Sequence, residues 1–163
     1  MAPMSYPRTQ SLDFLAVCSP RVAAIHAYWD RKRDARPMPA RSQIDPTELK
    51  PFLPGITLVD VGASAEDMRY RLMGTANVAS RGYDPTGQPV AERLFGRSKA
   101  DILENYRRVV TSKQPLYDGD MQRTASGFSR ESGTIYLPLS TNGKQVDMIL
   151  IYVDYADAEP PGR

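Results

Sequence analysis

Residues 68–87, MRYRLMGTANVASRGYDPTG, constrain the fold of this chain more than any other stretch. Its first six residues alternate in polarity, with Met68, Tyr70 and Leu72 on one face and two arginines on the other. A period of two residues is typical of a β-strand that buries one face. The stretch therefore begins as a strand over 68–73.

The period changes at Gly74 and Thr75, which form a sharp junction. Thr75 is placed to cap a short helix over 76–80, and the Gly- and Pro-containing segment 83–87 is a turn. A strand that runs directly into a small capped helix predicts a cavity wall beside a sheet. The rest of the chain supplies elements on both sides of this wall.

Before this stretch, Ser19 and Pro20 give a typical helix start, a capping side chain followed by proline at the first helical position. Val22, Ile25 and Trp29 then recur at helical spacing. Such a stripe docks either on its own domain or on a second copy of the chain. We take these three residues as the candidate interface for a homodimer or a signalling partner.

Asp45 and Pro46 start a second short helix, which two further prolines end quickly. Neither end of the chain shows periodicity, and we expect both to be flexible. We find no internal repeat and no second domain. The predicted divisions are a flexible tail over 1–10, an N-terminal helical extension over 11–54, a core over 55–155 and a second flexible tail over 156–163.

The core is predicted to hold five strands and one long helix. The helix runs over 98–112 and has one apolar stripe. Asn142-Gly143 is a strong hairpin signal between the last two strands, and Pro138 marks the end of regular pairing or a bulge. The predicted strands cover 56–61, 68–73, 116–123, 132–139 and 144–154.

A set of short motifs accompanies this order of elements. They are Ile44-Asp45-Pro46, Leu53-Pro54, YRLMGT at 70–75, GYDPTG at 82–87 and YLPLS at 136–140. Together they resemble a family of small stand-alone bacterial PAS-domain proteins, over residues 11–155. The resemblance implies an α+β fold with a five-stranded antiparallel sheet in the order 2-1-5-4-3. It also implies helices on one face of that sheet, in addition to the N-terminal helical extension.

The resemblance implies a non-catalytic sensory or regulatory module, but it implies no defined ligand. The first hypothesis is that the module binds a small molecule non-covalently between sheet and helices and signals through protein contact. The alternative is a ligand-free interaction or dimerisation module, because fold analogy alone does not choose between them. A polar cavity of ~300 Å³ or more would favour the ligand-binding hypothesis. The candidate pocket residues are Tyr70, Leu72, Asn77, Arg81, Tyr83, Phe95, Tyr106, Val110, Tyr136 and Met148, with Leu150 as a further sheet residue.

The sequence lacks the cysteine or histidine that several PAS-domain cofactors require at particular positions. The usual flavin photosensor has a cysteine on the helix after the second strand, and residues 77–81, NVASR, have none. A covalent chromophore would need a cysteine inside the core, and Cys18 lies upstream of it. Haem ligation usually takes a histidine on or near the long helix, whereas the only histidine is His26. We therefore expect no flavin–thiol adduct, no covalent chromophore and no haem, and leave the ligand unnamed.

Composition narrows the remaining function classes. An α+β cone-shaped enzyme is a further alternative, but such enzymes usually need an inward His–Asp pair, and we expect no catalytic residue and no metal site. The net charge of +2 is too small to indicate a nucleic-acid surface. No segment reaches the ~18 apolar residues of a membrane-spanning helix. We expect a cytoplasmic protein.

Overall fold

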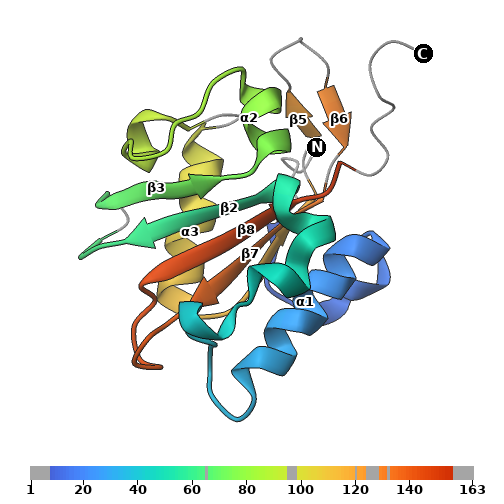
Figure 1. The fold of residues 1–163 in the computed structure, drawn as a ribbon, viewed down its shortest axis with the longest axis vertical. Coiled ribbons are helices and arrows are strands. Elements are labelled where there is room, and N and C mark those ends of the chain that lie inside the picture. The colour runs from blue at the N-terminus through green and yellow to red at the C-terminus, as the bar shows by residue number, and fades with distance from the viewer. Residues whose placement is uncertain are drawn as a thin grey trace, which may run out of the picture.

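The computed structural model describes residues 8–64, 66–94, 99–119, 121–123, 129–131 and 133–155 (Figure 1). Its helices are α1 (Pro20–Arg33), α2 (Thr75–Arg81) and α3 (Lys99–Ser112), with 3₁₀ segments η1 (Leu12–Ala16), η2 (Arg41–Gln43), η3 (Pro46–Gly55) and η4 (Val90–Glu92). Its strands are β1 (Arg8–Thr9), β2 (Ile56–Val61), β3 (Met68–Met73), β4 (Leu116–Asp118), β5 (Met121–Arg123), β6 (Ser129–Glu131), β7 (Thr134–Leu139) and β8 (Met148–Val153).

The main sheet is antiparallel and has six strands in the order β1-β4-β7-β8-β2-β3. Without β1, this is the predicted order 2-1-5-4-3, so the predicted α+β sheet is confirmed. The sixth strand comes from Arg8 and Thr9, which we had placed in a flexible tail. The other residues of the two predicted tails, apart from Gln10, lie outside the described residues.

Two layers of helices enclose the sheet. Helix α3 packs on β4 and β7 from one side, while α1 packs on β7 and β8 from the other, which faces the viewer in Figure 1. Both central strands are therefore buried on both faces, and every residue of β7 is buried. The apolar run over 148–153 had indicated this central position.

The apolar stripe of α1 packs within its own chain. Val22 and Ile25 are fully buried and Trp29 is 4% exposed. The Trp29 indole Nε1 donates a hydrogen bond to the backbone oxygen of Pro138 at 2.8 Å. The prediction that these residues form a dimer or partner interface is thereby corrected, because they are already buried where α1 packs on β7 and β8.

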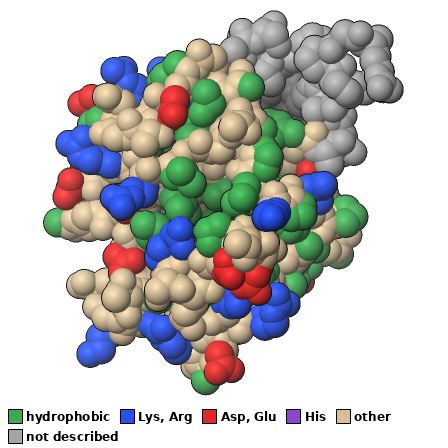
Figure 2. All heavy atoms as spheres, in the orientation of Figure 1, with side chains coloured by type: hydrophobic (Ala, Val, Ile, Leu, Met, Phe, Trp, Pro, Cys, Tyr) green, Lys and Arg blue, Asp and Glu red, His purple; other side chains and the backbone are tan. Residues whose placement is uncertain are grey.

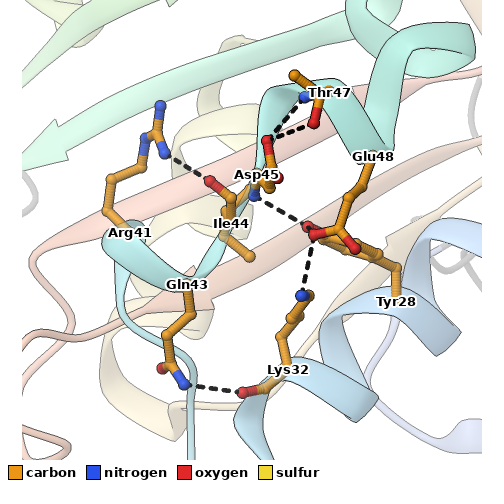
Figure 3. Close-up of polar contacts among 8 residues, drawn as sticks. All are labelled: Tyr28, Lys32, Arg41, Gln43, Ile44, Asp45, Thr47 and Glu48. Atoms are coloured by element: carbon orange, nitrogen blue, oxygen red, sulfur yellow. Dashed lines mark hydrogen bonds and ion pairs between the residues drawn. The ribbon is translucent and has the colours of Figure 1, made fainter.

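Polar contacts join residues 43–48, which follow α1, to that helix (Figure 3). The Tyr28 hydroxyl accepts from the backbone N–H of Asp45 at 2.9 Å and donates to Glu48. Lys32 pairs with the same Glu48 carboxylate at 2.9 Å, and the Gln43 amide donates to the backbone oxygen of Lys32. These contacts hold α1 and η3 as one layer on the sheet.

Three local predictions are corrected. Gly74, not Thr75, is the N-cap of α2, and no side chain bonds to that helix start. The predicted strand 116–123 divides into β4 and β5, and β5 pairs with β6 in a separate sheet. Gly143 does adopt a turn conformation, with φ of +75°, but within a longer loop between β7 and β8.

A bulge between β2 and β3 changes which residues face the cavity. The register passes from Leu58↔Leu72 to Val59↔Tyr70, which leaves Arg71 as an extra residue in β3. An extra residue reverses the side-chain alternation beyond it. Leu72 therefore lies on the α1 side of the sheet and is 48% exposed. Figure 2 shows this side of the molecule, with apolar side chains gathered near its middle.

The single histidine predicts how stability depends on pH. His26 lies against the rings of Phe14 and Trp29, and its burial lowers its pKa, an effect that Asp30 opposes and Arg33 adds to. The folded chain then binds fewer protons than the unfolded chain, whose histidine titrates near pH 6.5. We expect the contribution of His26 to the free energy of unfolding to be constant above about pH 6.5. Below that pH, this contribution should make the free energy of unfolding fall.

Urea unfolding at pH 7.5 and at pH 5.5 checks this expectation. The control is His26→Leu, which keeps a side chain of similar size in the aromatic cluster but does not titrate. Its loss of stability between the two pH values should be smaller than that of the wild-type chain. Equal losses in both chains would show that other groups account for the whole dependence.

Candidate functional site

A cavity of about 60 Å³ lies between the sheet and helices α2 and α3. Strands β2, β3, β7 and β8 form one wall, and the two helices form the other. Most of the lining side chains carry a hydroxyl, amide or guanidinium group. The lining residues are Thr57, Tyr70, Met73, Asn77, Ser80, Arg81, Ile102, Tyr106, Thr134, Tyr136, Ile151, Val153 and Tyr155.

Arg81 and Tyr70 join α2 to β3 at one end of the cavity. The Arg81 guanidinium donates to the Tyr70 hydroxyl at 2.8 Å and lies 4.9 Å from the centre of its ring. Arg81 and the Tyr70 hydroxyl both also donate to the backbone oxygen of Arg93. The arrangement fixes the start of the segment that leads from η4 towards α3.

Tyr106 of α3 and Tyr136 of β7 form the far side. Their rings meet edge to face with centroids 5.4 Å apart, and both are buried. Burial raises the pKa of both hydroxyls, and for Tyr136 the nearby Asp118 carboxylate adds to this rise. Both phenols therefore stay protonated at neutral pH. They offer neutral hydrogen-bonding groups rather than a phenolate nucleophile.

Asn77 connects three segments in the wall of the cavity. Its Nδ2 donates to Thr57 Oγ1 of β2 at 2.9 Å, and its Oδ1 accepts from the Tyr155 hydroxyl at 2.8 Å. Tyr155 follows β8, so this contact joins two parts of the chain 78 residues apart. Asn77 is 5% exposed; its bond to Thr57 is buried and its bond to Tyr155 is partly buried.

Thr134 provides an unsatisfied polar atom in the cavity wall. The residue is 1% exposed, and its Oγ1 has no hydrogen-bond partner among the described residues. A buried hydroxyl without a partner costs ~1–3 kcal/mol. A molecule with a donor or acceptor inside the cavity would remove that cost.

The structure brings five of the ten candidate pocket residues together: Tyr70, Asn77, Arg81, Tyr106 and Tyr136. The other candidates lie elsewhere. Leu72 is turned away by the bulge, Tyr83 is 43% exposed, and Val110 lines a second hollow near the loop over 142–147. Phe95 lies outside the described residues.

Strand parity explains the remaining candidate, Met148. The register pairs Thr57 with Ile151, so odd-numbered residues of β8 face the cavity. Met148 and Leu150 therefore face the α1 side. The residues of β8 that line the cavity are Ile151 and Val153 instead. Sequence reasoning also missed Thr57, Thr134 and Tyr155, and the alternation along β2 and β7 was the only available signal for the two threonines.

The size and lining of the cavity limit what it can hold. Small-molecule sites usually measure ~300–1,000 Å³, whereas one water molecule needs ~10–15 Å³. A cavity of about 60 Å³ has room for a few waters or a ligand of a few non-hydrogen atoms, but not for a flavin or a haem. Cys18 is not among the lining residues, and burial raises the pKa of its thiol.

The described part of the chain shows no buried, unpaired carboxylate in the first core strand, no metal site and no membrane-spanning helix. Asp60, the one carboxylate within the first core strand, is paired with Arg71 at 3.9 Å on the exposed side of the hairpin. No three histidine, cysteine, aspartate or glutamate side chains within the described ranges are grouped as a metal site would require. No helix in the described ranges is both long enough and apolar enough to cross a membrane.

A family model matches most of the chain. The family model described as "PAS domain" matches residues 17–152, which is most of the chain. No curated protein matches the chain.

Three solved structures are among those similar to this chain. A chain of an RNA-binding light-oxygen-voltage receptor is 18% identical with a TM-score of 0.48; the match covers 72% of this chain and 35% of that one. The PAS domain of an HTR-like protein from Haloarcula marismortui is 16% identical with a TM-score of 0.41, covering 60% and 79%. A fungal LOV-domain photoreceptor is 14% identical with a TM-score of 0.48, covering 88% and 97%.

Proposed function

Because the chain belongs to the PAS domain family, whose members are in general sensory modules, we propose that it is a non-catalytic regulatory module with a small-ligand site in its core. The ligand is a polar molecule of a few non-hydrogen atoms, bound non-covalently between the sheet and helices α2 and α3. Occupancy changes the contact that the module makes with another protein. A cytoplasmic location and a homodimer stay predictions from the sequence.

The unsatisfied Thr134 hydroxyl in the polar cavity is the observation that carries this proposal. The cavity supplies Asn77, Arg81 and the tyrosine hydroxyls around it, and no carboxylate is among its lining residues. A small carboxylate or amide could accept from these groups and bond to Thr134 as well. The same walls leave no room for larger cofactors.

Asn77 and Tyr155 support the step from ligand to output. Asn77 links the cavity to β2, and Tyr155 lies at the point where the chain leaves the sheet. A ligand that competes for the Asn77 amide would loosen the Tyr155 hydroxyl. The segment after β8 is thus coupled to the state of the cavity.

Small probe molecules test the proposal. The free energy of unfolding is measured for the full chain with acetate, acetamide or glycerol present, and with flavin mononucleotide as the large comparison. We expect at least one small probe, and not the flavin, to raise it, because a ligand that binds only the folded state stabilises that state.

Thr134→Val is the matched control, because valine keeps the shape of threonine and removes the hydroxyl. The variant should be as stable as the wild-type chain without probes, or more stable by ~1 kcal/mol, since an unsatisfied hydroxyl is lost. It should also lose the gain from the small probe. Stabilisation by none of the small probes would instead favour the ligand-free interaction module. The cavity of about 60 Å³ is the observation that supports this second candidate, because it is below the ~300 Å³ that would favour ligand binding.

A further inference from the structure

Strand β1 covers the edge of β4 with only two residues. Arg8 lies opposite Asp118 and Thr9 lies opposite Tyr117 in antiparallel register. An uncovered strand edge offers backbone groups to any extended segment that can pair with it. Residues 8 and 9 therefore show how a short extended segment binds to this edge.

The Arg8 side chain anchors the segment through charge. It is only 7% exposed and pairs with the Asp101 carboxylate of α3. Asp118, directly across from Arg8, is 1% exposed and accepts from the Asn105 Nδ2 at 2.7 Å. Two carboxylates from two different elements thus face one arginine, which suits the several donors of a guanidinium.

The groove continues beyond the arginine. The Gln10 amide donates to Ser112 Oγ at 2.6 Å and to the backbone oxygen of Gln114 at 3.3 Å, at the C-terminal end of α3. An open hollow of about 350 Å³ adjoins this contact and is lined by Gln10, Glu104, Arg107, Arg108, Thr111 and Ser112. The surface that residues 8–10 occupy, called the groove below, therefore runs from the edge of β4 to this hollow, whose lining residues other than Gln10 all belong to α3.

We propose that this groove is a docking site for an extended, arginine-bearing segment of a partner protein, and that residues 8–10 occupy it as a tethered competitor. The partner segment adds a strand to β4 and places its arginine between Asp101 and Asp118, a mode of recognition in which backbone bonds give affinity and a side-chain pocket gives specificity. The inference rests on the proposed function only in that output passes through protein contact.

A labelled peptide of residues 4–11, MSYPRTQS, tests the groove by fluorescence anisotropy against full-length chains. A tethered segment competes at an effective concentration in the millimolar range, so the wild-type chain should bind the peptide weakly. In the Arg8→Ala chain the competitor loses its anchor, and we expect binding at least ~10-fold tighter. A peptide with alanine in place of Arg8 should not bind, and Asp101→Asn in the Arg8→Ala chain should reverse the gain.

Gln10→Ala is a second variant, because it weakens the competitor at an exposed position and leaves the buried charges intact. It should also tighten peptide binding, by a smaller factor. If neither variant binds the peptide more tightly than the wild-type chain, or if the peptide without arginine binds equally well, the groove is not a docking site. Peptide binding in a Thr57→Val chain separates the two proposals. Thr57 lines the cavity from β2, which β7 and β8 separate from β4, so this change leaves the groove unchanged.

Discussion

Replacing Trp29 with alanine is expected to lower the free energy of unfolding by about 3–5 kcal/mol and to leave the oligomeric state of the chain unchanged. The indole is buried between α1 and the sheet, donates to the Pro138 backbone oxygen and lies beside His26. Its removal leaves a cavity and an unpaired carbonyl group. Nothing in this contact involves a second molecule.

Urea unfolding and size-exclusion chromatography check both parts of this expectation. Ala24→Ser on the exposed side of α1 is the control, and it should change stability by less than ~0.5 kcal/mol. A change of elution volume in Trp29→Ala, with stability unaltered, would contradict this expectation. It would show that the apolar stripe of α1 forms an interface with a second molecule.

Replacing Gly74 with alanine is expected to cost about 1–3 kcal/mol. A Cβ at this position would lie 2.4 Å from the backbone oxygens of both Leu53 and Pro54. Backbone atoms of η3 have no freedom to move aside without moving that segment. The start of α2 would shift instead, and with it the Asn77–Thr57 bond that closes the cavity.

Gly119→Ala gives the matched comparison, because its added Cβ would meet only the Tyr117 side chain, at 3.5 Å or more. We expect this second variant to unfold at nearly the same urea concentration as the wild-type chain. Equal stability in both variants would mean that the strand-to-helix junction is not held against η3.

The sequence was sufficient for the parts of the fold that depend on local pattern. Ser19 and Pro20 start α1 where the capping rule places them, and the Ser19 hydroxyl accepts from the backbone N–H of Val22. The positions of the predicted strands along the chain followed from hydrophobic runs and turn signals, whereas their order in the sheet was only what the family resemblance implies. Each of these signals lies within a few residues of the element that it specifies.

The errors arose where distant parts of the chain meet. The bulge that turns Leu72 outward depends on the pairing of β2 with β3, and no residue of β3 alone reveals it. Tyr155 reaches Asn77 across 78 residues. Arg8 belongs to a short polar segment that pairs with α3 and β4, about a hundred residues away in the sequence, so its sequence resembles a free tail. Tertiary contacts decided all three.

The unfolding free energy of the wild-type and Thr134→Val chains, with and without the small probes, tests the central claim most directly. At a probe concentration of 100 times its dissociation constant, the wild-type chain should gain ~2.7 kcal/mol and the variant should gain little or nothing. Equal gains in the two chains would place the probe outside the cavity. A gain with flavin mononucleotide would show that the core opens far beyond its volume of about 60 Å³. Either result would contradict a core that admits only a small, non-covalent polar ligand.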